Sequence, residues 1–125
     1  MRLVSRILLV EDDEDLVAVM SELLRDAGAE ACVAATSLSE VQRRGAEVLD
    51  FDVAIVDVNL GSGKPSGIDV CRWLRDEGFG GRTIFLTGHA QSHPLVVEAA
   101  RTAGAEVLAK PMRAEDLVRI AVRGP

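Results

Sequence analysis

The chain has 125 residues, of which 48% are apolar and 27% are charged, as in an ordinary globular domain. A chain of this length builds one core and leaves no room for a second domain. The net charge of −6 and the scattered basic residues argue against nucleic acid or an anionic membrane as a direct partner, because both attract clustered Lys and Arg.

The apolar run within residues 1–10 is too short for a signal peptide or a membrane span, and acidic residues follow it directly. We therefore expect a cytoplasmic protein. The two cysteines, Cys32 and Cys71, match no metal or redox spacing and lie in apolar stretches, which is typical of reduced, buried thiols.

The first part of the chain alternates short apolar runs with longer amphipathic ones. Residues 7–10 predict a buried strand. Over 13–27, apolar residues recur at offsets of three, four, seven and eight, which predicts a helix with one apolar face. Residues 31–35 predict a weaker strand, and Thr36 or Ser37 can cap a second helix.

The alternation continues through the middle of the chain. Residues 53–56 have a strong strand pattern, the loop 60–66 contains Gly and Pro, and a helix is expected over 67–76. A further strand is expected over 83–86.

The last part of the chain completes the pattern. Pro94 fits the first turn of a helix running to about residue 103, and a strand over 107–109 and a helix over 114–122 follow. Strands that are apolar on both faces, each followed by a helix, imply a parallel sheet covered on both sides. We therefore predict an α/β fold: a doubly wound (βα)₅ three-layer sandwich with a five-stranded parallel sheet in the flavodoxin-like order 2-1-3-4-5.

Polar residues follow four of the predicted strands closely. They are Glu11, Asp12, Asp57, Asn59, Thr87 and Lys110. The carboxyl ends of parallel strands lie at one edge of the sheet. Open α/β folds bind ligands at that edge, at the switch point of strand order, which here lies between the first and third strands.

Carboxylates gathered at this edge repel one another, by about 4 kcal/mol for two charges roughly 4 Å apart at an effective dielectric of about 20. Uptake of a proton or binding of a cation relieves the repulsion. Oxygen ligands without Cys or His select Mg²⁺ or Mn²⁺ over zinc. Lys110 and Thr87 add a cation and a hydroxyl suited to phosphate oxygens, so the edge fits phosphoryl transfer.

Each of these residues also has an ordinary structural explanation. An acid at a strand end is often a helix N-cap or a solvated loop charge. Thr87 alone is typical of a strand end or a turn, and the Lys110–Pro111 pair alone carries little information. Capping by itself is a poor explanation for four such positions at one edge.

Four segments carry a resemblance to a known family. They are ILLVEDD at 7–13, VAIVDVNL at 53–60, IFLTGHA at 84–90 and LAKP at 108–111. In this combination the chain resembles the receiver domains of bacterial response regulators in two-component signal transduction, of the chemotaxis-regulator-like kind. The resemblance covers about residues 5–122, so we expect a single receiver domain over 1–125 with no output domain within these residues. Both a stand-alone regulator and a piece of a larger protein fit this expectation.

The resemblance implies a role for each acidic residue. Asp57 is the expected phosphoacceptor and also a metal ligand. Asp12 is expected to bind Mg²⁺ directly and Glu11 through water, while the backbone carbonyl of Asn59 completes the protein's metal ligands. Asp13 lies one place beyond the usual acidic pair, and we interpret it as the N-cap of the first helix.

The resemblance also assigns roles around the phosphoryl group. Thr87 and Lys110 are expected to contact phosphoryl oxygens. Asn59 and His89 occupy positions that tune how fast water removes the phosphoryl group. Gly88 has no side chain, which leaves the site open to a phosphodonor.

The sequence departs from the family in its switch region, which we place at Gly88, Val107 and Pro111. The family usually has Tyr or Phe where this chain has Val107, so we expect the last strand with its flanking helices to signal in a way other than the usual coupling between hydroxyl and aromatic ring. The resemblance also implies a cis peptide bond before Pro111.

The loop after the phosphoacceptor departs from the family as well. A Pro commonly stands four residues after the acceptor, where this chain has Gly61, and the family's usual Gly falls two residues late, at Gly67. We infer about two inserted residues in the segment 61–66, which is placed to form part of a specificity surface.

The resulting hypothesis is a phosphorelay module. It takes a phosphoryl group from a sensor histidine kinase or a histidine phosphotransfer protein, and it then switches binding to a downstream protein or a fused output domain. It is not a conventional turnover enzyme, although it catalyses its own phosphorylation and slow dephosphorylation. The sequence is compatible with a homodimer.

Two alternatives stay open. One is a receiver-like interaction module that signals without phosphorylation. The missing aromatic residue keeps this alternative open, whereas the intact acids, Thr87 and Lys110 argue against it. The other is a small Mg²⁺-dependent phosphohydrolase with Asp57 as its nucleophile, for which the chain has no residues to spare for a cap.

Overall fold

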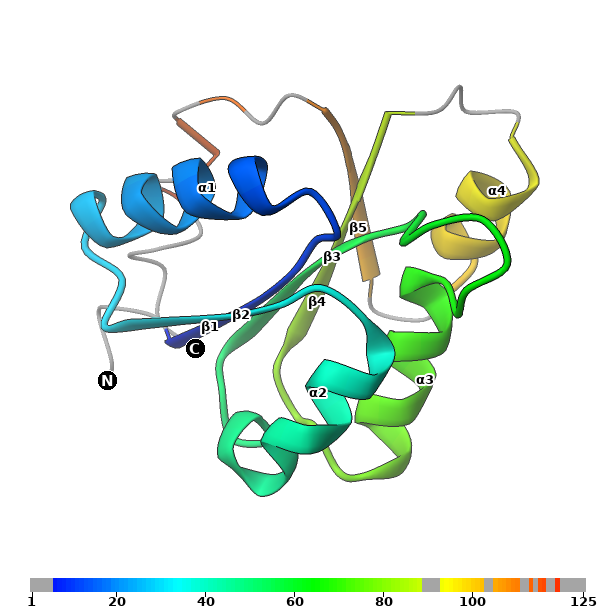
Figure 1. The fold of residues 1–125 in the computed structure, drawn as a ribbon, viewed down its shortest axis with the longest axis horizontal. Coiled ribbons are helices and arrows are strands. Elements are labelled where there is room, and N and C mark those ends of the chain that lie inside the picture. The colour runs from blue at the N-terminus through cyan, green and yellow to red at the C-terminus, as the bar shows by residue number, and fades with distance from the viewer. Residues whose placement is uncertain are drawn as a thin grey trace.

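A parallel sheet forms the centre of the protein. The computed structural model describes residues 6–88, 93–102, 105–110, 113, 115, 116 and 119. Within this part of the chain, five parallel strands form one sheet in the order β2-β1-β3-β4-β5 (Figure 1). The predicted α/β class and the flavodoxin-like strand order are therefore confirmed.

The strands and helices lie close to the predicted ranges. The strands are β1 (Arg6–Val10), β2 (Ala31–Ala35), β3 (Val53–Asp57), β4 (Arg82–Thr87) and β5 (Ala105–Ala109). The helices are α1 (Glu14–Asp26), α2 (Leu38–Arg44), α3 (Gly67–Asp76) and α4 (Pro94–Ala100), together with a short 3₁₀ helix, η1 (Gly45–Val48).

Helix starts agree with the capping residues expected from the sequence. Asp13 caps α1, because its side chain accepts from the backbone N–H groups of Asp15 and Leu16. Of the two candidates for α2, the cap is Ser37, whose hydroxyl accepts from the N–H of Glu40.

Two boundaries differ from the predictions. Residues 45–48 form η1, which the sequence pattern did not indicate. Helix α4 ends at Ala100 rather than near residue 103, and Arg101 is its C-cap. The helix predicted over 114–122 lies mostly outside the described residues.

Side chains alternate along each strand between two buried layers, since successive residues point to opposite faces of a sheet. The α1-side core contains Ile7, Leu9, Val53, Ile55, Ile84 and Leu86 from the strands and Met20 and Leu24 from α1. The α3-side core contains Leu8, Val10, Ala54, Val56 and Phe85 from the strands and Val41, Ile68, Cys71, Leu74 and Ala99 from the helices. Figure 1 shows α1 on one side of the sheet and α2 and α3 on the other.

Helix α3 begins directly against the end of β3. The backbone N–H of Gly67 donates to the carbonyl of Val58 at 2.8 Å. A Cβ atom on Gly67 would lie 2.1 Å from the carbonyl oxygen of Asp57, so only glycine fits here without a shift of the backbone. Ser66 and Asp69 form a reciprocal capping box that fixes the helix start.

Both cysteines, Cys32 and Cys71, are free and buried, as expected. Among the described residues, no helix has the length and apolar character needed to cross a lipid bilayer.

Candidate functional site

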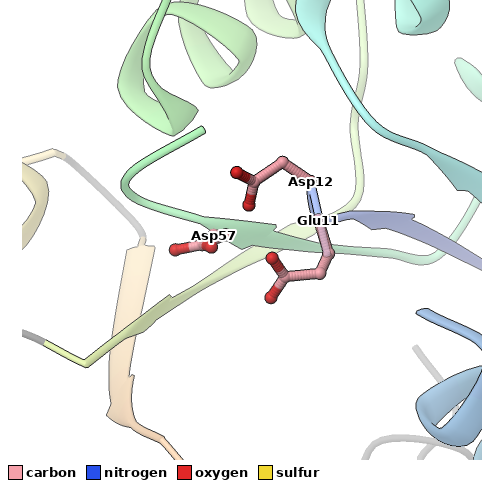
Figure 2. Close-up of side chains that lie close together, drawn as sticks. All are labelled: Glu11, Asp12 and Asp57. Atoms are coloured by element: carbon pink, nitrogen blue, oxygen red, sulfur yellow. The ribbon is translucent and has the colours of Figure 1, made fainter. Parts of the chain in front are cut away.

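Three carboxylates converge at the carboxyl edge of the two central strands. Glu11 and Asp12 follow β1, and Asp57 ends β3, which is hydrogen-bonded to β1 along its length. One carboxylate oxygen from each residue lies within 4.8 Å of the other two (Figure 2). Glu11 and Asp57 are buried, at 1% and 6% exposure, whereas Asp12 is exposed to solvent.

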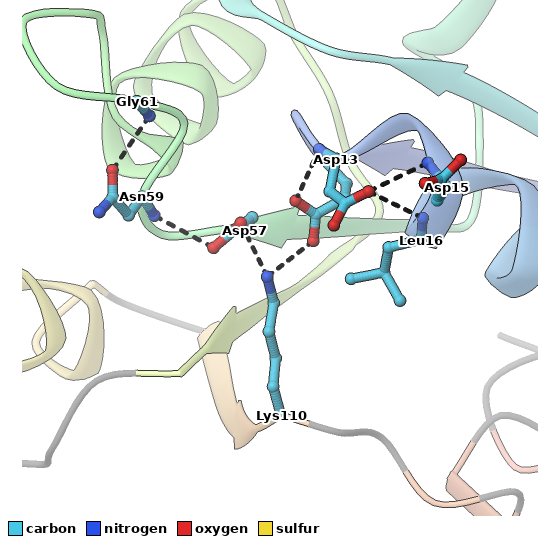
Figure 3. A network of polar contacts seen from close by, with 8 residues as sticks. Asp13, Asp15, Leu16, Asp57, Asn59, Gly61 and Lys110 are labelled. Atoms are coloured by element: carbon cyan, nitrogen blue, oxygen red, sulfur yellow. Dashed lines mark hydrogen bonds and ion pairs between the residues drawn. The ribbon is translucent and has the colours of Figure 1, made fainter.

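Lys110 bridges the two buried carboxylates from the far end of β5. Its ammonium donates to Glu11 Oε1 at 2.7 Å and to Asp57 Oδ2 at 2.9 Å (Figure 3). The backbone N–H of Lys110 donates to the carbonyl of Thr87, which ties the residue to the end of β4. Burial alone would lower the pKa of Lys110, but the hydrogen bonds to both carboxylates outweigh burial and raise the pKa.

The electrostatics of Asp12 differ from those of its neighbours. Although Asp12 is exposed, the protein around it reduces the solvation of its carboxylate, and a hydrogen bond with Glu11 adds to this effect, so the pKa of Asp12 is raised. Asp12 therefore holds a proton more readily than a free aspartate.

Glu11 is held by a local contact that the sequence analysis missed. The backbone N–H of Asp13 donates to Glu11 Oε2 at 3.2 Å, while Oε1 accepts from Lys110. The run of acids at 11–13 does not predict this hydrogen bond, because the geometry of the bond depends on the turn between β1 and α1.

Asn59 contacts both Asp57 and the loop that follows. Its backbone N–H donates to Asp57 Oδ1 at 3.2 Å, and its side-chain Oδ1 accepts from the N–H of Gly61 at 3.0 Å (Figure 3). Asn59 and Gly61 also line an open groove of about 510 Å³ with Lys64 of the loop and with residues of α3 and α4.

The other predicted site residues are only partly described. Thr87 is buried at the end of β4, paired in register with Ala109 of β5. Gly88 is exposed, and within the part of the chain that the structure describes a Cβ there would meet no atom within 4 Å. Val107 is half-buried and packs against the α3-side core. His89 and Pro111 lie outside the described residues.

The arrangement combines hard oxygen ligands with a fixed cation. Three carboxylates of this spacing fit a divalent ion that prefers oxygen, and the donor set contains neither sulfur nor imidazole. Lys110 places a positive charge at the same edge. An anionic group bound there would lie close to the Lys110 ammonium and to a divalent ion held by the carboxylates.

Comparisons with known proteins find the same fold in solved receiver domain structures. A receiver domain protein from Clostridium thermocellum is 30% identical, with a TM-score of 0.78 over 93% of this chain and 90% of that chain. A response regulator from Burkholderia pseudomallei, solved with a phosphorylated aspartic acid, a calcium ion and citrate, is 28% identical, with a TM-score of 0.76 over 94% of this chain and 66% of that chain.

The receiver domain of a LuxO repressor protein from Vibrio parahaemolyticus shares the fold, with a TM-score of 0.74 over 94% of this chain and 85% of that chain, at 24% identity. No curated protein sequence matches the chain. The family model of the response regulator receiver domain matches residues 7–122. The chain therefore belongs to the response regulator receiver domain family.

Proposed function

We propose that the chain is a phosphoacceptor receiver domain of a two-component phosphorelay, with Asp57 as the residue that takes the phosphoryl group. The observation that carries this proposal is the convergence of acids from β1 and β3 with Lys110 from β5 at one edge of the sheet. Its membership of the receiver family supports the same role.

The site residues that we assign to a metal are Glu11, Asp12, Asp57 and the backbone carbonyl of Asn59. Their oxygens suit Mg²⁺ or Mn²⁺, and Glu11 would act through water. When bound, such an ion neutralises charge on the phosphoryl oxygens and helps to align the phosphodonor. The calcium ion and phosphorylated aspartate of the Burkholderia relative support this assignment.

In the proposed reaction, one carboxylate oxygen of Asp57 attacks the phosphorus atom of a phosphohistidine on the partner. The new O–P bond forms as the P–N bond breaks, and the imidazole leaves with its electron pair and takes up a proton. Lys110 and Thr87 then stabilise the phosphoryl oxygens of the acyl phosphate, which requires Lys110 to exchange part of its contact with Asp57 for the new group.

Several further assignments belong to this proposal. We assign the switch region to Gly88, Val107 and Pro111, and the tuning of phosphoryl lifetime to Asn59 and His89. With an aliphatic Val107 packed on the α3-side core, the response to phosphorylation would travel by repacking of β5 and not by rotation of an aromatic ring.

The expected partners follow from this role. They are a sensor histidine kinase or a histidine phosphotransfer protein, and a downstream protein or output domain that reads the phosphorylated state, all in the cytoplasm. We expect one domain over 1–125 that catalyses only its own phosphorylation and dephosphorylation. The groove beside the loop 61–66 is a candidate specificity surface.

Incubation with acetyl phosphate and Mg²⁺, followed by intact-mass measurement, tests the proposal. We expect one phosphoryl group on the wild type and none on Asp57→Asn, the matched control that keeps the side-chain shape. Absence of an adduct, together with no binding of beryllofluoride, would favour an interaction module that works without phosphorylation. Repeated turnover of a phosphoester would favour a hydrolase.

A further inference from the structure

The backbone and the side chain of Asn59 form hydrogen bonds with two different partners, one on each side of it in the chain. The backbone N–H holds one oxygen of Asp57, the proposed phosphoacceptor, at 3.2 Å. The side-chain oxygen accepts from the N–H of Gly61 at 3.0 Å and so closes a turn over residues 59–61. In Figure 3 the labelled side chain of Asn59 points toward Gly61 and away from the Asp57 carboxylate.

The donor in this turn belongs to a glycine. The backbone N–H of Gly61 is the donor, and a proline at this position would have no backbone N–H to donate. Gly61 also has φ of +121°, a conformation that suits glycine. This sequence can therefore form the hydrogen bond that closes the turn, whereas a chain with proline at position 61 could not.

The rest of the loop is built on the same residue. The carbonyl of Gly61 accepts from the N–H of Lys64 at 3.3 Å, and the Lys64 stem lies so close that a Cβ on Gly61 would be 3.2 Å from its Cδ. Gly61 thus links the loop 61–66, through Asn59, to the carboxylate of Asp57.

We propose that Asn59 is a positioning residue. Its side-chain oxygen locks the 59–61 turn, and the locked turn fixes the backbone N–H that holds Asp57 and the backbone carbonyl assigned to the metal. This inference rests on the proposed function, and it gives the side chain of Asn59 a different task from direct contact with the phosphoryl group. In the structure this side-chain oxygen accepts from Gly61.

A pair of variants separates positioning from direct contact. Asn59→Ala removes the acceptor, whereas Asn59→Ser keeps a hydroxyl oxygen that can accept from the residue two places on, without adding charge. Because Asn59 is exposed, both variants are expected to fold, which urea unfolding checks. The readouts are Mg²⁺ affinity of the unphosphorylated protein by calorimetry and, in EDTA, hydrogen exchange of the Gly61 amide.

We expect Asn59→Ala to weaken Mg²⁺ binding by about tenfold, as for loss of a group that orients a ligand, and to speed exchange at Gly61. Asn59→Ser should recover most of both. Wild-type Mg²⁺ affinity in Asn59→Ala, or unchanged exchange at Gly61, overturns the inference. A change confined to the dephosphorylation rate would assign the side chain to the phosphoryl group. If the wild type itself neither binds Mg²⁺ nor takes a phosphoryl group, the proposed function fails first, and this inference fails with it.

Discussion

The three carboxylates at the edge of the sheet are held in different ways, although they lie within reach of one ion. Glu11 has bonded partners for both oxygens, the backbone of Asp13 and the ammonium of Lys110. Asp57 is held by Asn59 and by the same ammonium. Asp12 is exposed and has a raised pKa, so the metal-free protein disfavours the charged form of its carboxyl group.

Replacing Asp12 by Asn should therefore stabilise the metal-free protein at neutral pH, by about 1 kcal/mol or less because the group is exposed. A raised pKa means that the folded state binds the proton more tightly than the unfolded chain. The contribution of Asp12 to stability is thus present below its ordinary pKa of 3.8 and is lost as the pH rises through the folded value. Thermal unfolding in EDTA in acid and at neutral pH checks this.

The same variant carries a second readout. Millimolar Mg²⁺ should raise the melting temperature of the wild type, because the ion binds the folded acid cluster and not the unfolded chain, and the increase should be lost in Asp12→Asn. Identical melting curves of the wild type in Mg²⁺ and in EDTA would count against a metal at this edge.

At the level of elements, the junction between β3 and α3 determines how Asp57 is presented. The start of α3 lies against the carbonyl of Asp57, and the contact leaves no space for a side chain at Gly67. The bond from Gly67 to Val58 and the capping box of Ser66 and Asp69 hold the helix in that place. Movement of this helix start therefore moves the backbone of Asp57.

Gly67→Ala should cost about 3 kcal/mol of unfolding free energy, because a Cβ placed 2.1 Å from the Asp57 carbonyl oxygen forces the backbone apart. It should also slow phosphorylation by acetyl phosphate. Gly80→Ala is the control, since a Cβ there meets no atom within 4 Å. Urea unfolding of both variants measures the difference, and equal stabilities would mean that the junction relaxes without cost.

Local sequence patterns predicted some of the helices and strands and missed others. Strands such as β3 were predictable because both faces are buried and the apolar run is unbroken. Asp13 was predictable as a cap because capping depends on neighbours in sequence. Helix η1 was not, since a short 3₁₀ turn has no periodicity of its own.

On the scale of the whole molecule, the order of strands brings distant residues together. The sequence identified the acids and Lys110 as neighbours because parallel strands share one carboxyl edge. It did not predict that Lys110 bridges Glu11 and Asp57, or that Gly61 binds the side chain of Asn59, since both depend on side-chain directions set by tertiary contacts. His89 and Pro111 stay predictions, because they lie outside the described residues.

Lys110→Met should destabilise the protein by about 3 kcal/mol, because it leaves two buried carboxylates without their cation. The raised pKa of Lys110 means that its contribution is present below its ordinary pKa of 10.5 and is lost as the pH rises through the folded value. Mg²⁺ should restore part of the loss by supplying charge to the same acids. Urea unfolding with and without the ion measures both effects.

The control for this variant is Arg72→Met, which removes a cation from an exposed pair with Glu98 and should cost less than about 1 kcal/mol. Equal losses in the two variants would mean that the Lys110 bridge contributes no more than a surface ion pair.

The Lys110 bridge also has a consequence for the order in which the protein matures. Lys110 is separated from Glu11 by 99 positions and from Asp57 by 53, so a ribosome delivers the acids long before the cation. A nascent chain that has completed β1 and β3 still lacks this counter-charge, and contacts of such long range close late because they require the largest loss of chain entropy. Arrival of β5 therefore completes the sheet and the proposed phosphoacceptor site together.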